Sequence, residues 1–295
     1  MKTNNNSFSF CRVGLLMRRD VVENWRGLLW GCLALTAGFL LVMYMDVEEF
    51  EKHIQSFLPT SCNSYCLNFD VYERYVYNTM GSCKYLVGIL FFMFASMVMS
   101  SMSAKGGRVN FLMLPARNKE KFVARSFYVI VVPCILAVVG FVLSDMLRMI
   151  LFPMLGYYQG IFEPLQRSLL PGLFEMKLFK LFLVSHWGEW GGTFALSMFL
   201  CAYSLFVLGG NYWRKYAFLK TLGLILLLIV GGAFLAFVIA TNTHEDLYHS
   251  IMWTHYDIFI LVCSCFLLAW TLLNWYGSYR LFCRSQVVEP KRFSL

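Results

Sequence analysis

Six apolar segments, each about 20 residues long, constrain the fold of this chain most. That is the length an α-helix needs to cross the hydrocarbon core of a bilayer. A helix also satisfies its backbone hydrogen bonds within its own segment, as that core requires. The segments contain no charged residue and run from Gly27 to Met45, Tyr85 to Met102, Ser126 to Ser144, Gly191 to Gly210, Thr221 to Thr241 and Ile258 to Tyr279. We therefore predict an all-α, polytopic membrane protein with six transmembrane helices.

Composition supports one membrane domain over the whole chain, residues 1–295. Only 14% of the residues are charged, against about 25% in soluble domains. The polar segments are too short to bury a core of their own. The net charge of +8 is concentrated beside the apolar segments and not along one soluble face, so we expect no nucleic-acid partner.

The distribution of charge predicts the topology. Eighteen Lys and Arg residues lie in the N-terminal arm (1–26), in the connection after the second segment (103–126), in the connection after the fourth segment (211–220) and in the tail (280–295). The other three connections contain 7. Because cytoplasmic segments are enriched in Lys and Arg, both termini should be cytoplasmic. We expect a multi-pass protein of the cell inner (plasma) membrane.

The N-terminal arm has a two-faced pattern from Arg12 to Arg26. The polar face contains Arg12, Arg19, Glu23 and Arg26, and the apolar face contains Leu15, Val21, Val22 and Trp25. Arg18 also falls on the apolar face. This pattern is typical of a helix in the membrane interface. The alternative is a plain basic flank that only sets topology.

The predicted outer loops leave several questions open. The first, Asp46 to Lys84, contains Cys62, Cys66 and Cys83, which either form one disulfide in an oxidising compartment or stay as thiols in a reducing one. The second, residues 145–190, either re-enters the membrane or caps the outer mouth of a cavity. Histidines and cysteines fit no metal-ligand spacing, so no metal site is expected.

The connection from Lys105 to Arg125 is the most distinctive polar stretch. It contains six basic residues and one acid, Glu120. Gly106 and Gly107 break a helix, and Pro115 suits the first turn of a new one. Phe111 to Leu114 are four apolar residues, too few to span a membrane, and they require a surface to bury against.

Several chemistries are not expected. The sequence has no Gly-x-x-x-x-Gly-Lys-Ser/Thr loop, His-Glu-x-x-His or Gly-x-Ser-x-Gly motif, so we predict neither a nucleotide site, a cofactor nor hydrolase activity in this chain. The only ionisable candidate for membrane depth is Asp145, at the outer end of its span. A boundary ion pair with Arg148 explains it, which argues against an intramembrane enzyme or a proton-driven carrier.

The layout and two motifs resemble the membrane subunits of type-2 ATP-binding cassette transporters, especially bacterial permeases. One motif follows the fourth span as Gly-Gly-x-Tyr-Trp-Arg-Lys, and the other reads Asn110-Phe111-x-x-Leu114-Pro115-x-x-x-x-Glu120-Lys121-Phe122-x-x-Arg125. The resemblance implies a homodimer or heterodimer of permeases that binds a separate ATPase subunit and exports a substrate. The implied ATPase-coupling loop comprises Phe111, Leu112, Leu114, Pro115, Glu120, Lys121, Phe122 and Arg125.

We expect Glu120, Lys121 and Arg125 to pair with charges on that ATPase, which would orient the contact. The alternative is a non-transporting membrane scaffold or sensor associated with an ATPase or kinase. A neighbouring gene for an ATP-binding cassette ATPase favours the transporter, and a neighbouring histidine kinase favours the alternative. No polar group in the spans selects a substrate.

Overall fold

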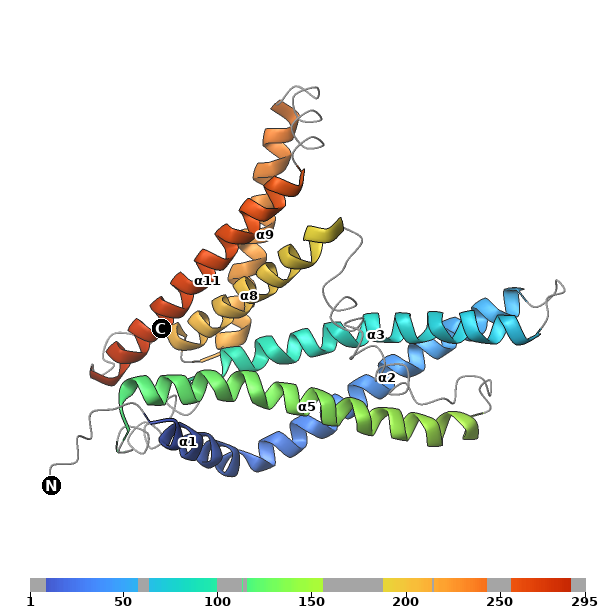
Figure 1. The fold of residues 1–295 in the computed structure, drawn as a ribbon, viewed down its shortest axis with the longest axis horizontal. Coiled ribbons are helices and arrows are strands. Elements are labelled where there is room, and N and C mark those ends of the chain that lie inside the picture. The colour runs from blue at the N-terminus through green and yellow to red at the C-terminus, as the bar shows by residue number, and fades with distance from the viewer. Residues whose placement is uncertain are drawn as a thin grey trace. The chain divides into compact units, whose positions relative to one another are not determined.

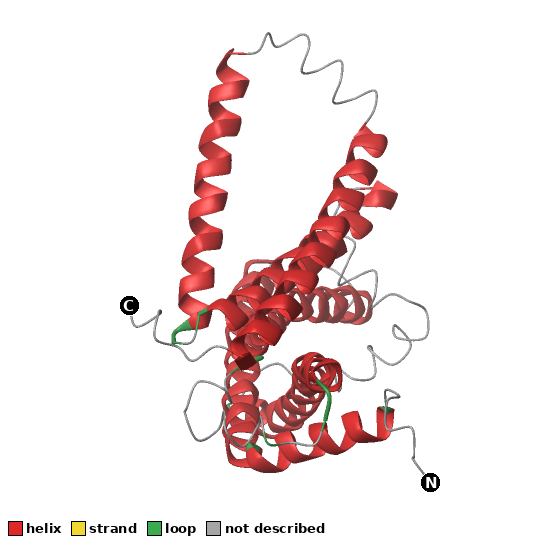
Figure 2. Ribbon diagram, turned by 90° about the vertical axis from the view of Figure 1, so that its left-hand side faces the viewer, coloured by secondary structure: helices red, strands yellow, loops and turns green. Residues whose placement is uncertain are grey.

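A computed structural model of the chain describes residues 9–57, 64–99, 113, 116–155, 188–213, 215–242 and 256–287. Within these ranges all regular structure is helical, as Figure 2 shows. The helices are α1 (Phe10–Glu23), α2 (Trp25–Phe57), α3 (Ser64–Ser96), α5 (Asn118–Met154), α8 (Gly188–Tyr212), α9 (Ala217–Asn242) and α11 (Tyr256–Val287). The predicted all-α class is confirmed.

Six of the described helices are long and apolar enough to cross a membrane, which confirms the predicted number of spans. The candidate spans are Trp25–Glu48, Asn78–Ser96, Asn118–Met154, Gly192–Tyr212, Ala217–Leu235 and Ile258–Arg284. The second begins and ends earlier than predicted. The polar loop predicted from Asp46 to Lys84 is largely helix, because α2 continues to Phe57 and α3 begins at Ser64. Good helix formers such as the glutamates after Asp46 sustain α2 beyond the apolar segment.

That helical extension changes the disulfide prediction. Cys83 lies inside α3 as a buried, free thiol, and is not one of three cysteines on an outer loop. Cys62 lies outside the described residues. The Cys66 side chain is likewise not described, so the disulfide prediction is untested for these two cysteines.

The predicted N-terminal helix is present as α1. Its first turn begins after Ser9, whose carbonyl accepts a hydrogen bond from the amide of Val13 at 3.3 Å. A break at Asn24 separates it from α2. Val13 and Asp20 are buried. Leu15 and Val22 are exposed on the opposite face, which is the apolar face that an interfacial helix would turn toward lipid.

The chain divides into two compact units, which we describe separately. Unit 1 comprises residues 1–18, 91–130 and 183–295, and unit 2 comprises residues 19–90 and 131–182. In unit 1, α8 packs against α11 and α9, which Figure 1 draws in yellow, red and orange. Aromatic rings fill this unit: Phe92 stacks on Phe206, whose ring also stacks on Phe218.

Close packing in unit 1 depends on two glycines of α8. A Cβ added to Gly210 would lie 2.6 Å from the carbonyl oxygen of Ser96, and one added to Gly209 would overlap Thr221. We predicted that these glycines end the fourth span. They instead lie inside α8, where the missing side chain lets neighbouring elements approach.

Unit 2 is built from α2, α3 and α5. Its apolar core consists of Met43, Val47, Tyr75 and Phe152. The hydroxyl of Ser144 in α5 donates to the carbonyl oxygen of Thr36 in α2 at 2.9 Å. A Cβ on Gly140 would lie 3.1 Å from Leu35, so α2 and α5 are in tight contact.

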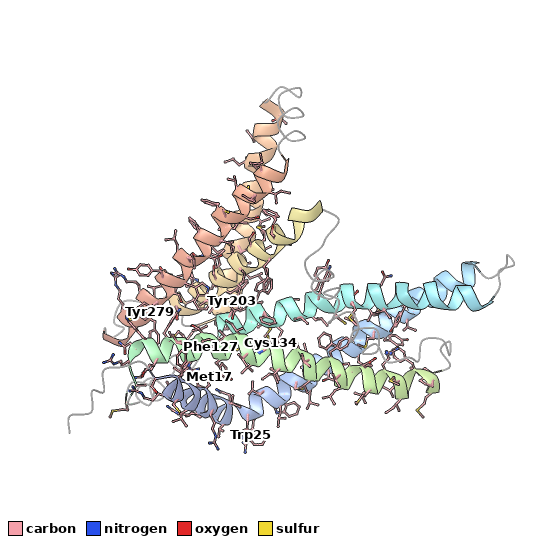
Figure 3. The ribbon with its side chains drawn as sticks, viewed as in Figure 1. Met17, Trp25, Phe127, Cys134, Tyr203 and Tyr279 are labelled. Carbon is pink, nitrogen blue, oxygen red and sulfur yellow. The ribbon has the colours of Figure 1, made fainter. Side chains whose placement is uncertain are left out.

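Many apolar side chains face outward on the predicted spans. Trp25 and Phe127, labelled in Figure 3, are each about half exposed. In α9, a run of exposed leucine, isoleucine and valine residues covers positions 226–230. Such surfaces are normal for helices that contact lipid or a second membrane subunit.

Pro133 interrupts the hydrogen bonding of α5. A proline inside a helix has no amide hydrogen for the carbonyl four residues earlier, which here belongs to Val129. The hydroxyl of Tyr203 in α8 donates to that carbonyl at 3.2 Å in a buried position. Tyr203 thus replaces the donor that Pro133 lacks.

We predict that Tyr203→Phe lowers the free energy of unfolding by about 1 kcal/mol, because a buried carbonyl loses its donor. In a Pro133→Ala background the new amide can serve Val129, so the same change should cost less. Thermal unfolding of the four proteins in detergent measures this coupling. Equal losses in both backgrounds would contradict it.

Candidate functional site

The candidate loop is described only in part. Phe111, Leu112, Leu114 and Pro115 lie outside the described residues. Met113 is exposed, and so are residues 117–119, which comprise the residue before α5 and its first two residues. The remaining candidates, Glu120, Lys121, Phe122 and Arg125, are all buried within the chain.

Glu120 caps the helix that contains it. Its Oε2 accepts a hydrogen bond from the amide of Arg117 at 3.1 Å, while the amide of Lys121 donates to the carbonyl of Arg117 at 2.9 Å. Arg117 is therefore the N-cap and Glu120 the third helical residue, which is one half of a capping box, because the Arg117 side chain has no acceptor for the Glu120 amide. A negative charge there also favours the positive end of the helix dipole.

The other carboxylate oxygen of Glu120 binds the N-terminal arm. Its Oε1 accepts from the backbone amide of Ser9 at 3.0 Å and lies 3.4 Å from Nη2 of Arg12. Ser9 immediately precedes α1, so one carboxylate joins the first residues of α1 and α5. The Glu120 side chain is completely inaccessible to solvent, whereas Arg12 is about one third exposed.

Phe122 fixes the start of α5 to α11. Its ring centroid lies 5.3 Å from that of Tyr279, 5.5 Å from that of Phe282 and 6.2 Å from that of Trp275. Phe122 and Phe282 form a buried apolar cluster. Figure 3 labels Tyr279 on α11.

The burial of these residues changes their expected role. We predicted that Glu120, Lys121 and Arg125 present charges to a partner, but in the isolated chain Glu120 is held by internal contacts. Lys121 and Arg125 are also buried and take part in contacts within the chain. The exposed groups beside them are Met113 and residues 117–119.

Sequence reasoning missed Ser9 and Arg12 as parts of this site. The arm and the loop are more than 100 residues apart, and no local pattern links them. The contact of Glu120 with Arg117 had only a weak signal: Glu120 is the only acid in the loop, but Arg117 is not one of the Ser, Thr, Asp or Asn residues that mark an N-cap.

Asp145 and Arg148 form the predicted ion pair. Nη2 of Arg148 lies 2.9 Å from Oδ1 of Asp145, and both side chains are almost inaccessible to solvent. We predicted a pair at the membrane boundary. In the structure both side chains are buried in unit 2.

Comparisons of the chain with protein-family models, curated proteins and solved structures found no match. The resemblance to transporter permeases therefore stays a prediction from the sequence.

We predict that Glu120→Ala destabilises the chain by about 1 to 3 kcal/mol, because the amides of Ser9 and Arg117 lose a buried acceptor. Glu120→Gln retains acceptor oxygen but loses the charge that pairs with Arg12, so its loss should be smaller. Thermal unfolding in detergent shows whether Glu120→Ala loses more stability than Glu120→Gln. Limited trypsin digestion should also cleave after Arg12 sooner in Glu120→Ala.

The matched control is Lys119→Ala, one residue away on the exposed side of α5. It should leave both the unfolding temperature and the digestion pattern unchanged. If Glu120→Ala behaves like this control, the carboxylate does not hold the arm.

Proposed function

We propose that the chain is the membrane-spanning permease subunit of an ATP-driven exporter, coupled to a separate ATP-binding cassette ATPase. Six candidate spans support a membrane subunit. The sequence carries no P-loop, so ATP binding would have to come from a partner. The apolar quartet from Phe111 to Leu114 gives that partner a surface to bury, at about 1.5 to 3 kcal/mol for each side chain.

The observation that carries the proposal is the attachment of the start of α5 to two other helices. Glu120 connects it to α1 through Ser9 and Arg12. Phe122 connects it to α11 through Phe282 and its neighbours. A partner that moves the 105–125 loop would therefore displace the start of α5 together with the start of α1 and with α11.

This arrangement divides the loop between two roles. The contact with the ATPase is formed by Phe111, Leu112, Leu114 and Pro115. Glu120, Lys121, Phe122 and Arg125 lie inside the chain and pass its movement to α1 and α11. The second group therefore positions helices and does not touch the partner.

A permease of this class works as a homodimer or heterodimer in the bilayer. The exposed apolar side chains of α9 and α11 supply surfaces suited to lipid or to a second permease. The distribution of Lys and Arg supports cytoplasmic termini and a cytoplasmic coupling loop in the inner membrane.

We predict that single cysteines placed at Asn5 and Asn118 resist a membrane-impermeant thiol reagent in intact cells, while one at Glu245 reacts. Asn118 is exposed in the structure, so its protection would come from the membrane. A background lacking the native exposed cysteines and a permeabilised sample are the controls. Labelling of Asn118 from outside would reverse the topology.

We predict that Phe111→Asp and Leu114→Asp leave the protein inserted but detach the ATPase, because a charge cannot occupy an apolar groove without a large cost. Glu120→Gln should retain the ATPase and lose most of its stimulation. Lys119→Ala should do neither. Co-purification with the ATPase encoded nearby, followed by ATP turnover, measures both effects.

The outcomes separate the alternatives. If Phe111→Asp and Leu114→Asp still bind and stimulate the ATPase, the loop is only an interfacial anchor and the proposal fails. If the unmodified complex binds ATPase but moves no compound across vesicles, the chain is a scaffold or sensor.

A further inference from the structure

Helix α11 has two different faces. The face that packs against α8 is buried and largely polar: Ser264, Thr271, Asn274 and Ser278 are at most 8% exposed. The side-chain amide of Asn274 donates to the hydroxyl of Ser204 in α8 at 2.9 Å. Spacings of three, four and seven residues place these side chains on one side of the helix. The other side of α11 is turned away from α8.

That other side is exposed and apolar along most of its length. Phe259, Val262, Phe266, Leu273 and Tyr276 are each more than half exposed, and their spacings again select one helical face. We call these five residues the apolar stripe. At a rise of about 1.5 Å per residue the stripe is about 26 Å long, close to the thickness of about 30 Å of a hydrocarbon core.

The apolar stripe continues into two arginines near the end of α11. Arg280 follows Tyr276 by four residues, Arg284 follows Arg280 by four, and both arginines are exposed. Residues at this spacing lie about 5 to 6 Å apart between their Cβ atoms on one face. In the part of the chain that the structure describes, neither guanidinium forms an ion pair. The stripe therefore ends in two positive charges that the described chain does not neutralise.

Tyr276 orients the first of these arginines. Nε of Arg280 donates to the Tyr276 hydroxyl oxygen at 3.0 Å, and the guanidinium carbon lies 5.4 Å from the centroid of the same ring. This contact uses one of the five N–H donors of Arg280. The other four remain for a ligand, and the planar fork of an arginine matches the oxygens of a phosphate.

A phosphate next to an apolar surface is the chemistry of a phospholipid. Basic residues beside a membrane span attract anionic headgroups. Two guanidiniums one helical turn apart favour a headgroup with net negative charge over a zwitterionic one, which carries its own positive charge. The apolar stripe offers the same molecule a surface for an acyl chain.

A second copy of this chain fits the face less well. Two copies related by a twofold axis along the membrane normal would meet through the same residues. Their contact along the apolar stripe would bring two copies of Arg280 and two of Arg284 together. The sequence of α11 from Ile258 to Val287 contains no Asp or Glu that could neutralise them.

We propose that the end of α11 binds an anionic phospholipid, with its phosphate on Arg280 and Arg284 and an acyl chain along the apolar stripe. Tyr276 then lies at the boundary between headgroup and chain, the depth at which tyrosine is enriched in membrane proteins. The site requires only that α11 spans a bilayer. It does not rest on the proposed binding of an ATPase.

The first test measures which lipid the full chain retains. Native mass spectrometry of the protein released from micelles that contain equal amounts of phosphatidylglycerol and phosphatidylcholine, with the same acyl chains, gives the ratio of the two bound lipids. The unmodified chain should prefer phosphatidylglycerol. Arg280→Gln and Arg284→Gln should each lower that preference by about fivefold, and the double variant should lower it further. Added salt should also lower it, because salt screens exposed charges.

A matched control removes the same number of positive charges elsewhere. Lys215 and Lys220 are exposed at the connection between α8 and α9. Nζ of Lys220 lies 4.9 Å from the ring centroid of Trp213, which resembles the contact of Arg280 with its tyrosine. The double variant Lys215→Gln, Lys220→Gln should keep the preference for phosphatidylglycerol. The proposal fails if this control loses as much of the preference as the double arginine variant, or if the arginine variant keeps it.

The second test separates a lipid from a free anion and from a second copy of the chain. In detergent, phosphatidylglycerol should raise the unfolding temperature of the unmodified chain more than that of the double arginine variant, while inorganic phosphate should not. If inorganic phosphate stabilises the chain through these arginines as strongly as the lipid does, the site binds a free anion and the lipid assignment is wrong. A change in oligomeric state in the double arginine variant without added lipid would assign the face to a contact between copies instead.

Discussion

The buried carboxylate of Glu120 is the contact on which unit 1 depends. A helix leaves its first amides without partners, and both α1 and α5 begin at this point. One carboxylate accepts from Ser9 and from Arg117, and pairs with Arg12. An uncharged or shorter side chain cannot serve both helix starts and the guanidinium, so the contact explains why a lone acid occurs in a basic loop.

Polar groups of α5 are satisfied in three different ways along the helix. At its start, Glu120 satisfies backbone amides. In its middle, Tyr203 supplies the hydrogen bond that Pro133 removes. Toward its end, Asp145 and Arg148 neutralise each other. Because α5 is continuous from Asn118 to Met154, a change at the loop and a change in unit 2 act on one element.

The sequence predicted the number of spans well, because the length of an apolar segment is a local property. It also predicted α1 and the Asp145–Arg148 pair. It missed the buried Tyr75, since this residue fell in a segment assigned to an outer loop by its charge. The burial of Tyr75 comes from α3, which begins well before the apolar segment. The Glu120–Ser9 contact was also not predicted, because no sequence pattern indicates which distant backbone amide donates to a given carboxylate.

The most direct test of this account is a double-mutant cycle between Arg12 and Glu120, read as the thermal stability of the full chain in detergent. Arg12→Ala, Glu120→Gln and the double variant are compared with the unmodified protein. The account predicts that Arg12→Ala costs much less once Glu120 is already Gln, because the two charges stabilise each other. Losses that simply add would contradict it.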